Sequence, residues 1–344
     1  MNSPQAYSPK RILVTGGAGF IGSNFVRYLF EKTSLNPSIT VLDKLTYAGN
    51  LENLADYDGK YTFVKGDICD AELVEKTISE SQIDSIVHFA AESHVDRSIL
   101  GSKVFTETNI LGTHVLLEAA RNNGVERFVH VSTDEVYGSL GETGYFTETN
   151  PIDPTSPYAA SKAASDLIVQ SYVKTHGFPG LITRCSNNYG PYQFPEKLIP
   201  LMITNAFRDK ELPVYGDGRN VRDWLHTDDH GAAILTVLQT GKVGEVYNIG
   251  GNNEMRNIEI VKLILKTLGK PESLIKFVKD RPAHDKRYAI DASKIKRELG
   301  WEPAITFEEG IAATIEWYQQ NESWWQRVMT GEYQSYYNEQ YANR

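Results

Sequence analysis

Two groups of side chains in the sequence could do chemistry together. Tyr158 and Lys162 are four residues apart, so a helix would place the phenol and the ammonium on one face. A lysine beside a tyrosine favours the phenolate, which could act as a base near neutral pH. Asp134 and Glu135 add two adjacent carboxyl groups after an apolar run. Hydride transfer needs only the first pair, so the acids suggest that the substrate also loses water.

Each pair also has a simpler interpretation. Tyr158 and Lys162 could be a surface pair, because Pro157 is typical of a helix start. Asp134 and Glu135 could form a solvated turn, which is the usual place for adjacent acids.

The elements that would position these residues alternate along the chain. Short apolar strands are expected at 11–15, 39–42, 61–64, 85–89, 127–131 and 181–183, and helices at 21–32, 73–79, 104–122 and 157–175. This alternation predicts an α/β fold, with a Rossmann-type doubly wound parallel sheet covered by helices on both faces. The two acids would then reach the edge of the sheet at the end of its fifth strand.

A change of texture after residue 190 predicts a second domain. Residues 10–190 are expected to form the dinucleotide-binding domain, to which 226–250 would return. Prolines punctuate the following sequence, so 191–225 and 251–344 are expected to form a smaller α/β substrate-binding domain. The polar residues 1–9 are expected to be a disordered lead-in.

A glycine-rich stretch follows the first strand and opens a helix. Gly16 would permit a tight turn, Gly19 a close approach to a pyrophosphate, and Gly22 close packing of helix and strand. Asp43 ends the second strand, where an acid binds the adenosine ribose and favours NAD over NADP. Lys44 beside it weakens that preference, and a glycine turn without a ligand is the alternative.

Residues after the third and fourth strands could extend the NAD site. Asp67 and Ile68 could read the adenine edge, although Asp67 could simply cap the following helix. Small residues after the fourth strand suit either close approach to a dinucleotide or ordinary strand–loop packing. These residues are Phe89, Ala90, Ala91 and Ser93.

Composition and charge exclude several classes of protein. The 344 residues carry a formal net charge of −9 with both signs interspersed, which speaks against nucleic-acid binding. Cys69 and Cys185 have no paired metal spacing, so no metal is expected and both are interpreted as reduced packing residues. No run approaches membrane length and no signal-peptide pattern is present, so a cytoplasmic location is expected.

The motifs together resemble the extended short-chain dehydrogenase/reductase family. The glycine motif, Asp43, Ser132-Thr133 and Tyr158-x-x-x-Lys162 mark that superfamily. Longer stretches at 43–50, 132–138, 186–191, 195–200 and 281–285 are similar to its nucleotide-sugar 4,6-dehydratases that act on dTDP-glucose.

This resemblance implies a lyase reaction with one bound, recycled NAD. Tyr158 would take the C4 hydroxyl proton, with Thr133 bonding the same oxygen and Lys162 lowering the tyrosine pKa and binding the nicotinamide ribose. Glu135 would remove the C5 proton and Asp134 would protonate the leaving C6 hydroxyl. Asp134 must then be protonated, and a neighbouring carboxylate in a dry site would raise its pKa.

The resemblance also implies the binding residues. Further NAD contacts would be Phe20, Ile21, Lys44, Leu45, Thr46, Thr108, Tyr158, Lys162 and Asn188. Substrate contacts would be Ser93, Thr133, Asn187, Lys197, Leu198, Pro213, Val214, Tyr215, Arg222, Asn257, Arg281, His284 and Tyr288. An isolated arginine is more usually part of a surface salt bridge, and His284 could be an ordinary loop histidine.

Other functions fit parts of the pattern. A UDP-galactose 4-epimerase shares Tyr158 and Lys162 but does not need the acids. A GDP-mannose 4,6-dehydratase should favour NADP, which Asp43 opposes, and a non-catalytic dinucleotide sensor would not need the catalytic residues. The resemblance further implies a homodimer through a four-helix bundle of the helices near 104–122 and 157–175. It also implies a role in deoxysugar synthesis, either for surface polysaccharide through dTDP-rhamnose or for antibiotic glycosylation.

Overall fold

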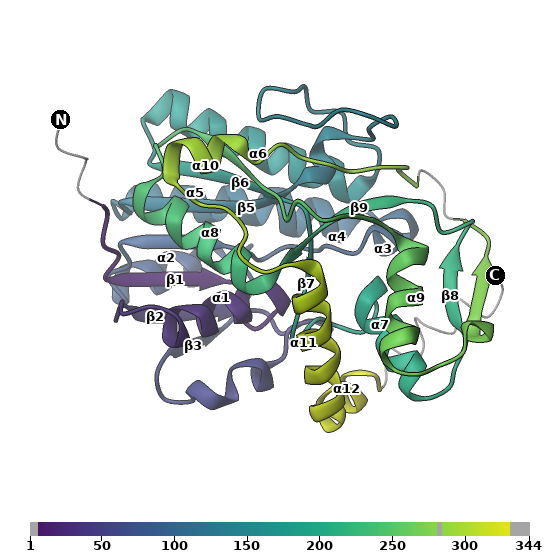
Figure 1. The fold of residues 1–344 in the computed structure, drawn as a ribbon. Coiled ribbons are helices and arrows are strands. Elements are labelled where there is room, and N and C mark those ends of the chain that lie inside the picture. The colour runs from purple at the N-terminus through teal and green to yellow at the C-terminus, as the bar shows by residue number, and fades with distance from the viewer. Residues whose placement is uncertain (1–5, 281–283, 331–344) are drawn as a thin grey trace.

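A seven-stranded parallel sheet forms the centre of the molecule (Figure 1). The computed structural model describes residues 6–280 and 284–330. The sheet has the order β10-β6-β5-β4-β1-β2-β3, and every neighbouring pair in it is parallel. Its strands are β1 Arg11–Thr15, β2 Ser38–Asp43, β3 Thr62–Lys65, β4 Ser85–His88, β5 Arg127–Thr133, β6 Gly180–Cys185 and β10 Val246–Ile249. The sheet confirms the predicted Rossmann-type α/β fold.

Helices cover both faces of this sheet, which explains why its strands are nearly continuous apolar runs. Ile12 and Val14 pack with α1 and α8 in one buried cluster, whereas Leu13 between them packs with α2, α5 and α6 in another. Alternate residues of a strand therefore supply two separate cores. The helices of these two layers are α1 Phe20–Glu31, α2 Ala71–Glu80, α5 Thr113–Asn122, α6 Pro157–His176 and α8 Thr227–Thr240.

The helix expected over 104–122 is present but is not uniform. It runs through α4 Lys103–Phe105, a π-helical segment at Thr106–Gly112, and α5. The π-helical segment carries Asn109, whose side chain accepts from the amide of Glu92 at 2.8 Å and donates to Ser161 Oγ of α6 at 2.8 Å. The irregular turn thus fastens the loop after β4 to the helix that carries Tyr158 and Lys162. Helix α3 (Val95–Leu100) precedes it.

A smaller group of elements has its own buried cluster, at the right and bottom of Figure 1. Its strands are β7 Asn187–Tyr189, β8 Leu212–Tyr215, β9 Val221–His226, β11 Glu254–Arg256 and β12 Ile275–Val278, paired as β11-β9-β7 and β12-β8. Its helices are α7 Leu198–Phe207, α9 Asn257–Thr267, α11 Phe307–Gln320 and α12 Glu322–Val328. Helix α10 (Ser293–Leu299) packs against β10. The division of the chain into two domains stays a prediction.

The predicted lead-in is ordered at its end. Tyr7 donates its amide to Gln239 O at 2.8 Å, and its hydroxyl lies 3.0 Å from Ser85 Oγ. These bonds join it to α8 and β4, so the expectation of disorder is wrong for this residue. Residues 1–5 lie outside the described residues. Across 6–280 and 284–330, no helix combines the length and apolarity needed to cross a membrane.

Candidate active site

The glycine turn after β1 has positions that leave no room for a side chain. Gly16 has φ 69°, and a Cβ there would lie 2.6 Å from Ala90 N. A Cβ at Gly22 would lie 2.3 Å from Gly16 O. Gly19 precedes α1 and gives it no side-chain cap, so the first amides of the helix are available to an anion. Strand, turn and helix therefore form a cradle for a phosphate group.

Asp43 closes one side of this cradle. Its carboxylate accepts from Ala18 N at 3.0 Å and from Leu45 N at 2.8 Å. Burial raises the pKa of Asp43, and these amide bonds oppose the rise. Lys44 is directed to Asp67, at 2.6 Å between Nζ and Oδ2. The ammonium next to Asp43 is thus paired with another acid.

Asp67 does not cap helix α2, so the simpler interpretation of that residue is wrong. The cap is Asp70, which accepts from Leu73 N at 3.1 Å. Asp67 instead accepts from Cys69 N at 2.9 Å. Asp67 lines the same cavity as the glycine turn.

One cavity at the carboxyl ends of the central strands brings most of the predicted site residues together. Those on its walls are Gly16, Gly19, Phe20, Ile21, Gly22, Asp43, Lys44, Thr46, Asp67, Ile68, Phe89, Ala90, Ala91, Ser93, Thr108, Thr133, Asp134, Glu135, Tyr158, Lys162, Asn187, Asn188 and Lys197. Leu45 is not among its lining residues, although its amide supports Asp43. Cofactor and catalytic candidates thus share one continuous wall.

The cavity also has lining residues that the sequence analysis did not single out. Cys185, interpreted as a packing residue, is one of them, and Glu196 is another. Glu196 lies in the stretch 195–200 that carries the family resemblance, but it was not assigned a role there. The additional lining residues are Leu42, Ala48, Gly49, Gly66, Glu92, Val131, Ser132, Cys185, Ser186, Gln193, Phe194 and Glu196.

The turn after β5 presents the two acids to this cavity. A short 3-10 helix, η3 (Asp134–Tyr137), begins after Thr133, whose Oγ1 accepts from Glu135 N at 3.3 Å and donates to Asp134 Oδ1 at 3.3 Å. Asp134 is 2% exposed, so the interpretation as a solvated turn is wrong for it. Its Oδ2 has no hydrogen-bond partner within the described part of the chain.

The protonation of Asp134 follows from this burial. Burial raises the pKa of Asp134 well above its usual 3.8, and the charges of Glu135 and Asp223 raise it further. This shift favours the protonated form of the carboxyl group. This is the state that a proton donor to a leaving hydroxyl needs.

Helix α6 places Tyr158 and Lys162 on the wall of the same cavity, close to the turn that bears the acids. Ser156 caps the helix by accepting from Ala159 N at 3.1 Å, and Pro157 occupies its first turn. Tyr158 and Lys162 are 8% and 4% exposed, so the interpretation as a surface pair is wrong. Lys162 Nζ donates to the carbonyl of Val131 at 2.9 Å.

The electrostatics of this pair differ from the expectation. Burial raises the pKa of Tyr158 well above 10.0, and the charge of Glu135 adds to the rise. Burial also lowers the pKa of Lys162 from 10.5 to about 8. In the protein alone, desolvation outweighs the expected lowering of the tyrosine pKa by the lysine. Burial therefore disfavours the charged forms of both Tyr158 and Lys162.

Arg222 approaches the acids from strand β9. It is buried, its guanidinium donates to Val221 O at 2.8 Å and to Asp285 O at 3.0 Å, and it lies 4.4 Å from the ring centroid of Tyr288. A surface salt bridge is thus excluded for Arg222. The charge of Arg222 lowers the pKa of Asp134 and so opposes the effect of burial. The pKa of Tyr288 is raised mainly by burial and also by the charge of Glu135.

The other substrate candidates among the described residues are not lining residues of the cavity, and some of them are bonded to neighbouring side chains. Tyr215 donates to Asp96 Oδ2 at 3.1 Å, and His284 Nδ1 lies 2.5 Å from Asp280 Oδ1. Asn257 begins α9 with a buried amide oxygen that has no partner among the described residues. Arg281 lies outside the described residues. The candidates absent from the cavity wall are Leu198, Pro213, Val214, Tyr215, Arg222, Asn257, His284 and Tyr288.

Comparisons with known proteins agree with this geometry. A family model described as GDP-mannose 4,6 dehydratase matches residues 13–314. A dTDP-glucose 4,6-dehydratase of Xanthomonas campestris pv. campestris is 57% identical over 341 residues, covering 93% of this chain and 96% of its own. This chain belongs to the nucleotide-sugar 4,6-dehydratase family.

Solved structures of two related enzymes differ in how similar their sequences are to this chain. The dTDP-glucose 4,6-dehydratase DesIV of Streptomyces venezuelae, solved with NAD bound, has a TM-score of 0.90 and 53% identity, covering 92% of this chain and 99% of its own. A UDP-glucose 4-epimerase of Thermotoga maritima has a TM-score of 0.85 but 31% identity, over 91% and 99%. The fold is common to both activities, and the sequence is nearer to the dehydratase.

Proposed function

We propose that the chain converts dTDP-glucose into dTDP-4-keto-6-deoxyglucose and water. The observation that carries this function is the placement of Asp134 and Glu135 on the same cavity wall as Tyr158 and Lys162. An epimerase has no use for a buried, protonated carboxyl group at this position. The full-length similarity to dTDP-glucose 4,6-dehydratases supports the same activity.

The residues present fit NAD as the cofactor. A Cβ at Gly16 or Gly22 would collide with backbone atoms and deform the cradle that a pyrophosphate needs, and the carboxylate of Asp43 suits an unphosphorylated ribose. NAD bound here supplies the acceptor for the C4 hydride and later the donor for C6. The cofactor is regenerated in each turnover, so no external reductant is consumed.

Tyr158 acts first, as the base that removes the proton of the C4 hydroxyl. Thr133 holds the same oxygen by a hydrogen bond. The ammonium of Lys162 favours the phenolate form of the tyrosine and binds the nicotinamide ribose. Because burial raises the pKa of Tyr158, this function depends on the positive charges of Lys162 and of the nicotinamide ring of NAD⁺ near the phenol.

The acid pair then removes water. A C4 carbonyl makes the C5 proton acidic enough for Glu135 to take it, and Asp134 gives its proton to the C6 hydroxyl as the C6–O bond breaks. Glu135, whose proton exchanges with solvent, protonates C5 when C6 receives the hydride. Tyr158 releases the proton of the C4 hydroxyl and Asp134 takes up one proton, so one water leaves and no net oxidation takes place.

The diphosphate and the base of the substrate lie on the side of the smaller domain in this proposal. Arg222 supplies a cation for the diphosphate, together with Lys197, Asn187 and Arg281. Strand β8, through Pro213, Val214 and Tyr215, lines the thymine pocket. The substrate site is completed by Ser93, Leu198, Asn257, His284 and Tyr288.

Incubation with dTDP-glucose and no added reductant tests this function. We expect the mass of the sugar nucleotide to fall by one water, with deuterium from heavy water retained at C5. An unchanged mass with inversion at C4 would identify an epimerase instead. Reaction only with another nucleotide sugar would contradict the assignment of dTDP-glucose as the substrate and would leave the proposed mechanism intact.

We further propose that the protein is a homodimer through α6 and the helix over 103–122. Large apolar side chains are exposed on α3, the π-helical segment and α6, and a packed partner would cover them. We expect light scattering to give a dimer, and Leu111→Glu with Leu167→Glu to give a monomer. A monomeric wild type would contradict the proposal. The exposed residues are Ile99, Leu100, Val104, Leu111 and Leu167.

The pathway and the location are also proposals. A 4-keto-6-deoxy sugar nucleotide is an intermediate on the way to dTDP-rhamnose, and we place the protein in cytoplasmic synthesis of surface polysaccharide. Complementation of a bacterial strain that lacks its own dTDP-glucose dehydratase tests this role. We expect restored rhamnose in the surface polysaccharide, and its absence despite soluble, active protein would contradict the assignment.

A further inference from the structure

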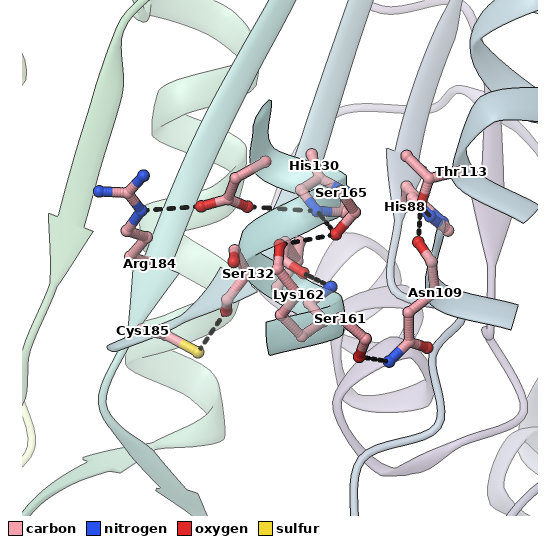
Figure 2. A network of polar contacts seen from close by, with 12 residues as sticks. His88, Asn109, Thr113, His130, Ser132, Ser161, Lys162, Ser165, Arg184 and Cys185 are labelled. Carbon is pink, nitrogen blue, oxygen red and sulfur yellow. Dashed lines mark hydrogen bonds and ion pairs between the residues drawn. The ribbon is translucent and has the colours of Figure 1, made fainter. Parts of the chain in front are cut away.

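A charged residue lies inside the central sheet, behind the acid pair. Arg184 is on β6, is 2% exposed, and is paired in register with Ser132 of β5 and Asn248 of β10. Its Nε donates to Asp166 Oδ2 at 2.8 Å (Figure 2). A buried guanidinium is costly unless it is paired, so its contacts have to explain its presence.

The first contact fastens Arg184 to the helix of the redox pair. Asp166 is one helical turn beyond Lys162 on α6, and its Oδ1 lies 3.4 Å from His130 Nε2. Ser165 joins this group by contacting His130 at 3.1 Å and the Lys162 carbonyl at 2.8 Å. Burial opposes ionisation of Asp166, but the hydrogen bond with His130 and the charge of Arg184 together lower its pKa. Arg184 and Asp166 therefore form an ion pair anchored on α6.

The second contact fastens Arg184 to the turn of the acid pair. Its guanidinium carbon lies 4.8 Å from the ring centroid of Tyr137, the last residue of η3. The Tyr137 hydroxyl donates to Asn248 Oδ1 at 2.8 Å, and its ring stacks on Phe146 at 5.1 Å between centroids. The turn that bears Asp134 and Glu135 thus ends on a ring held by Arg184.

We propose that Arg184 is a positioning residue that sets the acid pair relative to the redox pair. Its planar guanidinium bonds Asp166 through an N–H group while it contacts the tyrosine ring, which a lysine ammonium does not do equally well. The inference rests on the proposed function, because only a dehydratase needs both pairs aligned on one sugar. A displacement of about 1 Å costs roughly a hundredfold in rate.

The test measures the two halves of the reaction separately in Arg184→Lys. The C4 oxidation is followed with dTDP-6-deoxyglucose, which has no C6 hydroxyl to lose, by the absorbance of the reduced nicotinamide. Elimination is followed as water loss from dTDP-glucose. We expect elimination to fall roughly a hundredfold while C4 oxidation stays close to wild type, so reduced cofactor accumulates on the enzyme.

Two variants of Tyr137 protect the test against misfolding. Tyr137→Leu removes the ring, and we expect it to reproduce the effect of Arg184→Lys with the ion pair intact. Tyr137→Phe keeps the ring and removes only the bond to Asn248, so we expect a smaller loss in the same step.

Arg27→Lys is the matched control. Arg27 also combines an ion pair, at 2.9 Å to Asp56, with a tyrosine ring, at 5.2 Å to the Tyr57 centroid. We expect both half-reactions to be unchanged in this variant. Equal losses of oxidation and elimination in Arg184→Lys and Tyr137→Leu, or no loss in either variant, would overturn the positioning role. A wild-type protein that loses no water from dTDP-glucose would instead refute the proposed function.

Discussion

The cavity wall with the proposed reacting groups and the region expected to hold the nucleotide differ in the hydrogen bonding of their polar side chains. At the proposed reaction centre, Asp134 has a carboxyl oxygen with no hydrogen-bond partner among residues 6–280 and 284–330, and Lys162 is a buried ammonium bonded to a backbone carbonyl. In the smaller group of elements, Arg222 and Tyr215 bond to neighbouring protein atoms. Tyr158 and Lys162 are thus desolvated with little compensation, whereas Arg222 and Tyr215 are bonded to protein atoms, although Asn257 Oδ1 lacks a partner among the described residues.

This contrast indicates where each region obtains its function. Buried, poorly compensated groups have shifted pKa values, which prepare them for proton transfer at the cost of stability. Satisfied cations must exchange a protein partner for a phosphate, so their contribution to binding is a difference between two sets of bonds. We therefore expect substitutions of the buried reacting groups to change the stability of the protein. Substitutions of the bonded cations should instead change KM.

The largest effect is expected at the acid pair. Asp134→Asn and Glu135→Gln should each lower the rate of water loss by about a hundredfold to ten-thousandfold, because each removes one proton transfer. Glu135→Gln should still oxidise C4, and bound reduced nicotinamide would reveal that partial reaction. Water loss at the wild-type rate in Glu135→Gln would show that another base serves C5.

Asp134 also determines whether the rate of elimination rises or falls with pH. Asp134 works in its protonated form, and its pKa is raised, so elimination should slow as the pH rises through that pKa. Asp134→Asn should lose this basic limb from its residual rate. A limb of unchanged position in the variant would assign it to another group.

The next effect is on stability, at Lys162. The pKa falls from 10.5 to about 8, which corresponds to about 3 kcal/mol against the folded state below pH 8. Between these values the unfolded chain holds the proton and the folded protein does not, so folding becomes more favourable as pH rises. Lys162→Met should abolish activity and remove this pH dependence.

Denaturant unfolding at neutral pH and above pH 10.5 measures this difference. The stability of Lys162→Met relative to wild type should decrease by about 3 kcal/mol across that interval. Lys174→Gln, at an exposed site on the same helix, is the control and should track the wild type. A constant difference for Lys162→Met would mean that the ammonium is not strained.

A smaller effect is expected on the satisfied side. Arg222→Lys keeps the charge and loses the planar group, so we expect KM for dTDP-glucose to rise about tenfold with little change in kcat, since a hydrogen bond to a charged group contributes roughly 1.5–3 kcal/mol. Arg287→Lys, which alters a 2.7 Å ion pair with Glu254, is the matched control. A fall in kcat alone would place Arg222 at the acid pair instead.

The smallest effect is expected at the edge of the cofactor site. Asp43→Asn keeps an oxygen for one of the amides of Ala18 and Leu45 but loses the charge. We expect NAD affinity to weaken by about 1 kcal/mol and the discrimination against NADP to narrow. Titration calorimetry of the cofactor-free protein measures both affinities. Unchanged discrimination would show that Asp43 does not set the preference for NAD over NADP.

The sequence by itself determined the features that depend on neighbouring residues in the chain. Alternating apolar strands and helices predicted the parallel sheet, and the glycine spacing predicted the turn after β1. The spacing of Tyr158 and Lys162 required only a helix, which α6 provides. Periodicity and turn chemistry are local, so they can be interpreted without knowledge of what packs against them.

Only the tertiary structure decided burial, and with it the protonation of the reacting groups. The raised pKa of Tyr158 and the lowered pKa of Lys162 come from desolvation by segments that are distant in sequence. The choice of Asp70 over Asp67 as the cap of α2 depended on where that helix begins.

The role inferred for Arg184 depended on contacts of the same long-range kind. The strand predicted at 181–183 ended before Arg184, and nothing local identifies Asp166 or Tyr137 as its partner. Such pairings join residues on different elements, so the fold has to be formed before they exist.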